Sequence, residues 1–133
     1  MKLMKRSNEY KASNVTFNPK TNEAYSYSHW CFVMMINGKL VFNNYNYSNT
    51  TNKHQSKVRS LLGELNIKVD LVIESSQSLK IDDALNDAII LCENKISILK
   101  AAIAKKGSRK TTNENREKTI IELKEQIKNI KSL

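Results

Sequence analysis

The sequence predicts an α+β fold, made of a small ββαβ sheet unit followed by a C-terminal antiparallel helical hairpin. Asn37-Gly38 stands between two apolar, β-rich runs, which is the strongest short-range signal for a β-hairpin. Apolar residues then recur at helical spacing over 51–65 and alternate with polar residues over 67–74, which completes the unit. From residue 85 onward the apolar period changes to that of a coiled coil.

Length and charge favour one basic domain. The chain has 133 residues, with 22 Lys and Arg against 13 Asp and Glu and a formal net charge of +9. No apolar run approaches the ~20 residues that span a bilayer, so we expect no contact with a membrane. Cys31 and Cys92 are far apart and no secretory leader precedes them, which favours a reducing, cytoplasmic compartment.

Residues 1–23 are expected to form a basic, polar arm that is only loosely held. They contain the only proline and show no sustained period of 2 or 3.6, so one short strand near Val15 and Phe17 is all that the pattern supports. The ββαβ unit then occupies 24–76. The helical hairpin occupies 82–133 and is expected to pack with the sheet as one domain.

The β-hairpin is predicted to pair a strand over 25–36 with a strand over 39–47. A two-residue turn fixes the register, which places four pairs opposite one another: Met35 and Leu40, Val33 and Phe42, Cys31 and Asn44, and His29 and Asn46. Near the turn both faces of these strands are apolar. We therefore expect the sheet to be covered on both sides, by its own helix on one and by the C-terminal helices or a partner on the other.

A helix is predicted over 51–65 because its apolar residues follow the spacing i, i+3, i+4, i+7. Thr50 or Thr51 is the expected N-cap. Asn66 is expected to end the helix, since Asn tolerates the left-handed conformation. A third strand over 67–74 should follow through a right-handed crossover, which places the helix on one face of the sheet.

Two helices over roughly 82–106 and 112–132 are predicted to form the antiparallel hairpin. Their apolar residues follow alternating spacings of three and four, which is the pattern of a coiled-coil seam. A basic stretch separates the helices, and Thr111 with Glu114 forms a capping box that restarts the second one. The same seams also allow a homodimer, and the sequence does not separate pairing within one chain from pairing between chains.

Familiar signatures of catalysis are absent from the sequence. It contains no P-loop, no Gly-x-Gly-x-x-Gly, no His-Glu-x-x-His and no Cys-x-x-Cys. We therefore expect a protein that is not an enzyme and has no metal or cofactor. Asp70 and Glu74 faintly resemble the carboxylates of metal-dependent nucleases, although the polar face of a half-buried strand accounts for them too. A small nuclease that uses these residues or His54 is the least favoured hypothesis.

The first candidate binding site is the junction between the second hairpin strand and the helix. Hydroxyls, amides and cations crowd it, and the free N–H groups of a helix N-terminus favour an anion such as phosphate. Its tyrosines, together with Tyr25 and Tyr27, offer faces on which bases of single-stranded nucleic acid stack. The alternative is a well-capped helix whose tyrosines pack at the sheet edge. The residues assigned to this site are Tyr45, Tyr47, Ser48, Thr50, Thr51, Lys53, His54, Lys57 and Arg59.

The second candidate binding site is the turn between the two C-terminal helices. The stretch 100–110 carries five positive residues and no acidic one. Cations that neutralise phosphates release counterions, so such a turn would bind nucleic acid with marked salt dependence. The alternative is an ordinary solvated loop. The residues assigned to this site are Lys105, Lys106, Arg109 and Lys110.

One stretch of the chain carries a recognisable signature after the β-hairpin. It runs from Tyr25-Ser26-Tyr27 through Gly38-Lys39-Leu40-Val41-Phe42-Asn43-Asn44-Tyr45 to Tyr47-Ser48-Asn49-Thr50-Thr51-Asn52-Lys53-His54-Gln55, with the pattern Tyr-Ser-x-Thr-Thr-x-Lys-His. This stretch resembles small proteins of phages and other mobile elements. The resemblance implies a phage-type origin and the cytoplasm of a bacterial host, where many small basic proteins modulate host enzymes or defence complexes, as anti-CRISPR proteins do.

These features favour a basic, non-enzymatic protein that contacts RNA, DNA or a host ribonucleoprotein, as a phage-encoded inhibitor of a CRISPR-type defence complex. The alternative is a coiled-coil assembly protein that does not bind nucleic acid and whose charge serves only solubility. Salt-sensitive binding of nucleic acid is expected of the first, and a mass that depends on concentration is expected of the second.

Overall fold

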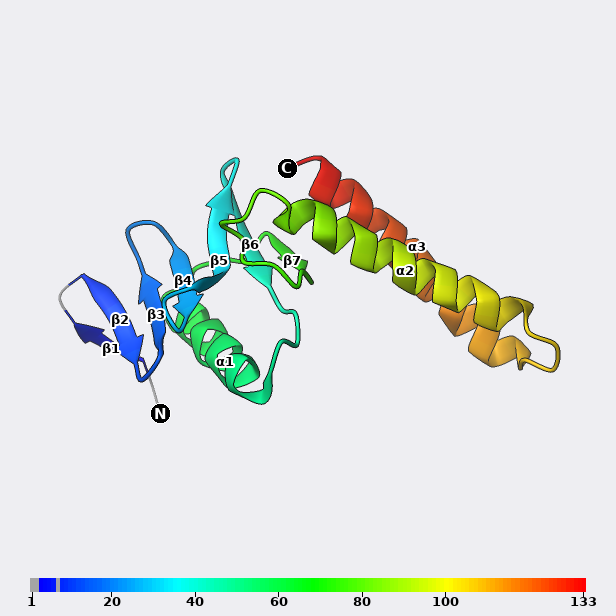
Figure 1. Cartoon of the computed structure of the whole chain (residues 1–133), viewed down its shortest axis with the longest axis horizontal. Coiled ribbons are helices and arrows are strands. Elements are labelled where there is room, and N and C mark those ends of the chain that lie inside the picture. The colour runs from blue at the N-terminus through cyan, green and yellow to red at the C-terminus, as the bar shows by residue number, and fades with distance from the viewer. Residues whose placement is uncertain (1–2, 7) are drawn as a thin grey trace.

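The computed structural model describes residues 3–6 and 8–133 and contains a seven-stranded sheet and three helices (Figure 1). The elements are β1 (Met4–Arg6), β2 (Glu9–Ala12), β3 (Val15–Asn18), β4 (Glu23–Ser26), β5 (Trp30–Ile36), β6 (Lys39–Asn43), α1 (Asn49–Glu64), β7 (Leu71–Ile73), α2 (Ala84–Ala104) and α3 (Lys110–Lys131). The strands lie in chain order, antiparallel except for the parallel pair β6–β7. The predicted α+β class is confirmed, but the sheet is larger than the predicted ββαβ unit.

The expected loose arm over 1–23 is wrong for residues 3–6 and 8–23, because β1, β2 and β3 continue the sheet on its N-terminal side. Residues 1, 2 and 7 lie outside the described part of the chain. Val15 and Phe17 of β3 are fully buried, and Ala12 of β2 is nearly so. Each of these strands has only three or four residues. A strand of that length contributes at most two inward side chains, which is too few to show the alternation by which strands are recognised.

The strand predicted over 25–36 is two strands, β4 and β5, joined by a tight turn. Tyr27 and Ser28 have φ values of 56° and 61°, in the left-handed region that ends an extended strand. The Tyr27 N–H donates to the Asn14 carbonyl over 2.6 Å, which fixes this turn against the preceding one. Neither Gly nor Pro marks the turn, so the sequence gives no usual signal for it.

The predicted register is confirmed near the Asn37-Gly38 turn, where Val33 pairs with Phe42 and Met35 with Leu40. Farther from the turn, the predicted pairs of Cys31 with Asn44 and His29 with Asn46 are wrong, because β6 leaves the sheet after Asn43. The loop after β7 takes its place. The Cys31 N–H donates to Ser78 Oγ over 3.0 Å, and the Leu79 N–H donates to the Cys31 carbonyl over 2.9 Å.

A β-bulge in β5 changes which side chains share a face. Ala24 pairs with Val33 while Tyr25 pairs with Cys31, so Phe32 is an extra residue in β5. Phe32 and Val33 consequently both pack into the core beneath α1, although strict alternation predicted opposite faces for them. The bulge thus gives the face beneath α1 two adjacent large side chains.

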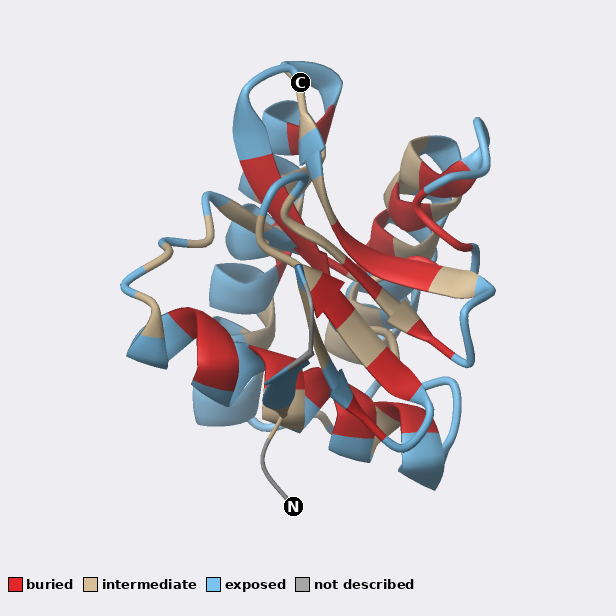
Figure 2. Ribbon diagram, turned by 90° about the vertical axis from the view of Figure 1, so that its left-hand side faces the viewer, coloured by how far each residue is buried: buried red, intermediate tan, exposed pale blue. Residues whose placement is uncertain are grey.

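Both faces of the sheet are covered, as predicted. On one face α1 contributes Val58, Leu61 and Leu62 to the core. On the other face Ala84 of α2 and Ile130 of α3 pack with buried residues of β5, β6 and β7. Figure 2 shows the buried residues along the central strands and on the side of α1 that faces them.

The ends of α1 agree only in part with the prediction. Its N-cap is Ser48, whose Oγ accepts from the Thr51 N–H over 3.1 Å, so the predicted caps Thr50 and Thr51 lie within the first turn instead. Asn66, with φ of 56°, follows the C-cap Leu65, as predicted. The Ser48 hydroxyl satisfies the first N–H groups equally well, and the sequence offers three hydroxyl residues within the four positions 48–51.

β7 is shorter than the predicted strand over 67–74. The Asp70 N–H donates to the Leu40 carbonyl, and the Asp70 carboxylate accepts from the Leu40 N–H over 2.7 Å. The carboxylate therefore takes a position that a backbone carbonyl would hold in a longer ladder. Ile67 and Val69 still pack against the core beneath α1, which explains their alternation without a strand.

The two C-terminal helices pack against each other within the chain and project from the sheet (Figure 1). Cys92, Ile96 and Ile120 are buried in the seam between them. α2 alone has 21 residues, which corresponds to an arm of about 30 Å. The predicted capping box is wrong, because α3 begins at Lys110 and its N-cap Arg109 makes no side-chain cap bond. None of the described helices is both long and apolar enough to cross a bilayer.

Candidate functional site

The hydroxyls at the start of α1 are largely committed to the helix itself. Ser48 Oγ donates to Thr51 Oγ1 over 3.1 Å as well as accepting from the Thr51 N–H, and Thr51 is only 4% exposed. Thr50 is exposed, and Tyr45 is half-buried. The predicted phosphate corner thus matches the alternative of a well-capped helix more closely.

His54 is buried rather than presented to solvent. Its side chain is 4% exposed, and its Nδ1 lies 2.7 Å from Ser26 Oγ, so the pair connects α1 to β4. The Tyr27 ring lies 5.4 Å from the imidazole. Burial, followed by the positive charge of Lys57, lowers the pKa of His54. His54 is therefore a neutral structural residue at pH 7 rather than a cation for phosphate.

We expect the stability of the protein to fall as the pH drops below the ordinary histidine pKa near 6.5. The unfolded chain then takes up a proton that folded His54 resists, and stability is complete only above that pH. Urea unfolding at pH 7.5 and pH 5 would measure the loss. In His54→Gln the loss should shrink, whereas His29→Gln, which changes an exposed ring, should keep it. Equal losses in both variants would contradict the assignment.

The three cations of α1 differ in their surroundings. Lys53 is exposed and Lys57 half-buried. Arg59 donates to Asn44 Oδ1 over 2.6 Å and lies over the Phe42 ring, with 4.9 Å between the guanidinium carbon and the ring centroid. Arg59 is therefore held against the sheet by a cation–π contact. Lys53 and Lys57 lie one turn apart on the same side of α1, whereas Arg59 is bound at the sheet.

A pocket of about 410 Å³, which we call the aromatic pocket, lies where β5 and β6 part. It combines residues from the β4–β5 turn, the start of α1 and the loop after β7. Tyr27 and Tyr47 were noted from the sequence as stacking faces, but Trp30 and the wall after β7 were missed. The lining residues are Ser26, Tyr27, His29, Trp30, Tyr47, Ser48, Thr51, Ser76, Gln77, Ser78 and Ile81.

The wall of the aromatic pocket is fixed by buried polar contacts. Asn43 accepts from the Ser75 N–H over 2.9 Å and donates to the Ser75 carbonyl over 2.9 Å. The Asp87 carboxylate of α2 accepts from the Ser76 N–H over 2.7 Å and from the hydroxyls of Ser75 and Ser76. The loop that lines the pocket is thus held in place before any ligand arrives.

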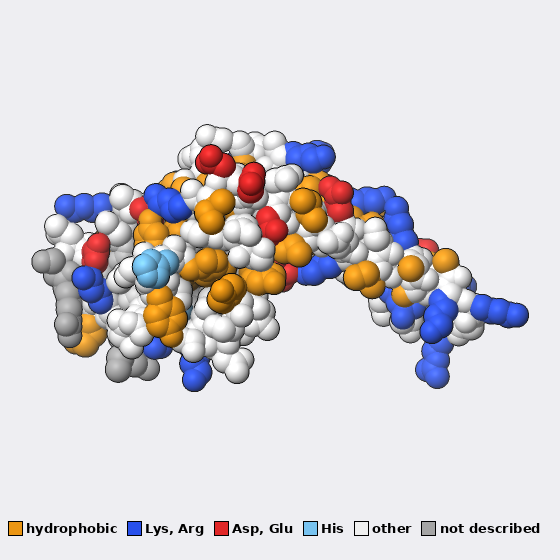
Figure 3. All heavy atoms as spheres, viewed as in Figure 1, with side chains coloured by type: hydrophobic (Ala, Val, Ile, Leu, Met, Phe, Trp, Pro, Cys, Tyr) orange, Lys and Arg blue, Asp and Glu red, His pale blue; other side chains and the backbone are white. Residues whose placement is uncertain are grey.

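The turn between α2 and α3, which we call the basic tip, gathers the predicted cations at the far end of the arm. Lys105, Lys106, Arg109 and Lys110 are all exposed there, and Figure 3 shows Lys and Arg side chains at this end. The tip encloses a hollow of about 450 Å³ that Arg116 also lines, a residue that the sequence analysis missed. No Asp or Glu occurs between Glu93 and Glu114.

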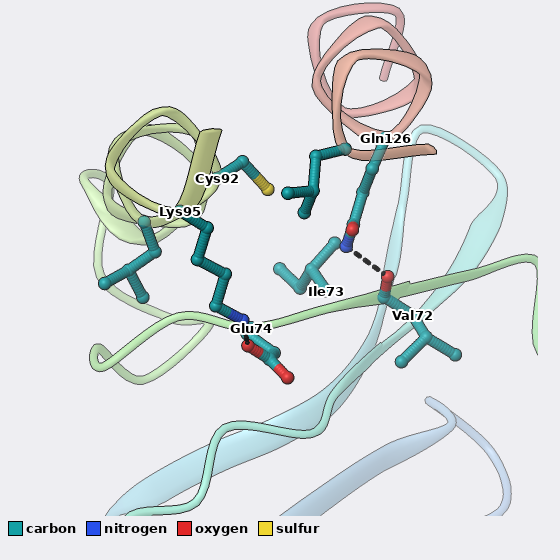
Figure 4. A pocket seen from close by; sticks show the side chains of 8 residues that line it. Val72, Ile73, Glu74, Cys92, Lys95 and Gln126 are labelled. Carbon is teal, nitrogen blue, oxygen red and sulfur yellow. Dashed lines mark hydrogen bonds and ion pairs between the residues drawn. The ribbon is translucent and has the colours of Figure 1, made fainter. Parts of the chain in front are cut away.

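A smaller pocket of about 350 Å³ lies between α2, α3 and β7 (Figure 4). Lys95 forms an ion pair with Glu74 across its mouth. The Gln126 amide donates to the Val72 carbonyl over 2.9 Å. Burial raises the pKa of the Cys92 thiol, which is therefore protonated at neutral pH and a poor nucleophile.

The remaining chemical candidates do not form a cluster. Glu74 is paired with Lys95, and Asp70 is bound to the backbone of Leu40. Burial raises the pKa of Cys31 to about 11. Among residues 3–6 and 8–133 no three His, Cys, Asp or Glu side chains lie together in a group that could hold a metal ion. The described residues thus offer no support to the nuclease hypothesis.

Comparisons of the chain with models of protein families, with curated proteins and with solved structures found no match. The resemblance to phage and mobile-element proteins therefore stays a prediction. The molecule has two candidate binding features, the basic tip and the aromatic pocket, and the α2–α3 arm of about 30 Å separates the tip from the sheet.

Proposed function

We propose that this protein binds nucleic acid, free or within a ribonucleoprotein, through its basic tip. The observation that carries the proposal is the exposure of Lys105, Lys106, Arg109 and Lys110 at the end of a projecting arm. The ion pairs found among the described residues involve other cations, namely Lys11, Lys80 and Lys95. The charge of the tip is therefore available to phosphates, and counterion release supplies the binding free energy.

We expect the affinity of the basic tip for nucleic acid to depend strongly on salt. Changing Lys105, Lys106, Arg109 and Lys110 to Glu should abolish binding of a labelled strand of about 20 nucleotides in a fluorescence anisotropy titration. For a single strand, four phosphate contacts weaken binding about 50-fold between roughly 50 and 200 mM salt, so the unchanged protein should show at least that dependence.

A control variant tests whether binding depends on the charges of the tip or only on the net charge of the protein. It reverses the same number of exposed lysines that are spread over the rest of the molecule, namely Lys20, Lys39, Lys68 and Lys124. This variant should keep most of the affinity. If both variants bind equally well, or if the unchanged protein binds no strand at low salt, the proposal is wrong.

A narrower form of the proposal concerns a host defence complex of CRISPR type. It is supported by the resemblance of residues 25–65 to phage proteins and by the phosphates that a guide RNA offers to a basic tip. Inhibition of target cleavage by such a complex, lost in the tip variant, is the expected result. Undiminished cleavage would reject this form.

The assembly hypothesis has less support. The seam residues that suggested a homodimer pack between α2 and α3 of one chain. A homodimer through the same seams would require the hairpin to open first, which exposes apolar surface that is now buried.

A further inference from the structure

The aromatic pocket presents two large aromatic rings to solvent. Tyr47 is 65% exposed and Tyr27 is 48% exposed. The Trp30 and Tyr47 rings lie next to each other with centroids 5.8 Å apart, in a tilted arrangement. Exposed rings grouped in one pocket are typical of a site where a flat ligand stacks.

The pocket exposes mainly apolar surface together with a few hydroxyl, amide and imidazole groups, and its lining carries no Lys, Arg, Asp or Glu. Among the contacts of the described residues, the Tyr27 and Tyr47 hydroxyls, the His29 ring and the Gln77 amide make no hydrogen bond. The Trp30 Nε1–H is buried and also has no partner there. Buried indole N–H groups ordinarily find an acceptor. The lining therefore fits an uncharged, planar ligand with donors and acceptors, and it does not fit a phosphate.

We propose that the aromatic pocket takes an unstacked base of a single-stranded nucleic acid. The proposal rests on the proposed function, because a strand combines the planar base that this pocket fits with the phosphates that the basic tip fits. Bases of a duplex stay stacked inside the helix and do not reach such a pocket. The pocket thus confers a preference for single strands that the tip alone does not have.

Trp30 is the only tryptophan of the chain, so its fluorescence reports directly on the pocket. The probe is an oligothymidylate of about 20 nucleotides, compared with an abasic strand of the same length and phosphate count. Both strands should bind the tip, but only the oligothymidylate should quench Trp30 saturably. Tyr47→Ala should weaken oligothymidylate binding at least about fivefold, leave the abasic strand and a duplex unchanged, and be rescued by Tyr47→Phe. Because Tyr47 is exposed, these changes should not impair folding.

The outcomes distinguish the proposal about the aromatic pocket from the proposed function of the basic tip. If both strands bind equally, without quenching and without an effect of Tyr47→Ala, the pocket proposal is overturned and the proposed function stands. If no strand binds at low salt and none quenches Trp30, both are overturned. If thymidine monophosphate quenches as strongly as the strand, the pocket is a nucleotide site and the single-strand proposal is overturned.

Discussion

Phe42→Ala is expected to lower the free energy of unfolding by about 3–5 kcal/mol. Phe42 is 1% exposed and meets Phe32 edge to face, with ring centroids 5.9 Å apart. Arg59 covers the ring from the surface. Truncation would leave a cavity between the sheet and α1 that the short, paired strands cannot close. The loss is a large fraction of the roughly 5–15 kcal/mol that stabilises a typical domain.

Urea unfolding followed by circular dichroism measures this effect. Phe42→Leu should lower the free energy of unfolding less than Phe42→Ala does, because leucine keeps most of the buried volume. Met35→Ala is the matched control on the neighbouring strand. Met35 is 37% exposed, so its truncation should lower the free energy of unfolding only slightly. A loss below about 1 kcal/mol for Phe42→Ala would show that the core beneath α1 repacks around the missing ring.

Asn43→Ala is expected to cost about 3 kcal/mol, although it removes only a polar side chain. Asn43 is fully buried. Its side-chain amide donates to the Ser75 carbonyl, and its Oδ1 accepts from the Ser75 N–H and, over 3.1 Å, from the Tyr45 N–H. Without the amide, these backbone groups are left unpaired and buried, which costs more than the net gain of the bonds themselves.

The neighbouring asparagine provides the control. Asn44 is exposed and makes one side-chain bond, to Arg59, so Asn44→Ala should cost at most about 1 kcal/mol. Asn43→Ala should in addition loosen the wall of the aromatic pocket and change the fluorescence of Trp30. Equal stability of the two variants would show that water replaces the amide of Asn43.

The features that sequence reasoning predicted correctly depend on near neighbours. Asn37 and Gly38 both adopt positive φ, 49° and 79°, as their turn requires, and the register beside them follows from the turn alone. Asn66 ends α1 for an equally local reason. Helical spacing over α1 and over the C-terminal arm extends through several turns, so single irregularities do not obscure it.

The features that the sequence did not predict depend on distant partners or on very short elements. The bulge at Phe32 exists only in relation to β4. It reverses the predicted faces of the earlier residues of β5, so that Phe32 lies beneath α1 and Cys31 lies on the opposite face. The buried contacts of Asn43 were not predicted, because its partner Ser75 lies 32 positions away in the chain. For the same reason the wall of the aromatic pocket could not be found, whereas the basic tip is contiguous in the sequence and was predicted.

The contact between Gln126 and Val72 has a consequence for how the protein behaves at high concentration. β7 is the last strand of the sheet, and the Ile73 carbonyl bonds back toward β6 through the Asn44 N–H, so the Val72 carbonyl points outward. An unpaired, outward carbonyl on an edge strand can accept a hydrogen bond from a strand of another molecule, which would then add to the sheet. The α3 side chain already occupies that acceptor. The projecting arm thus also hinders the addition of a strand from another molecule at the β7 edge of the sheet.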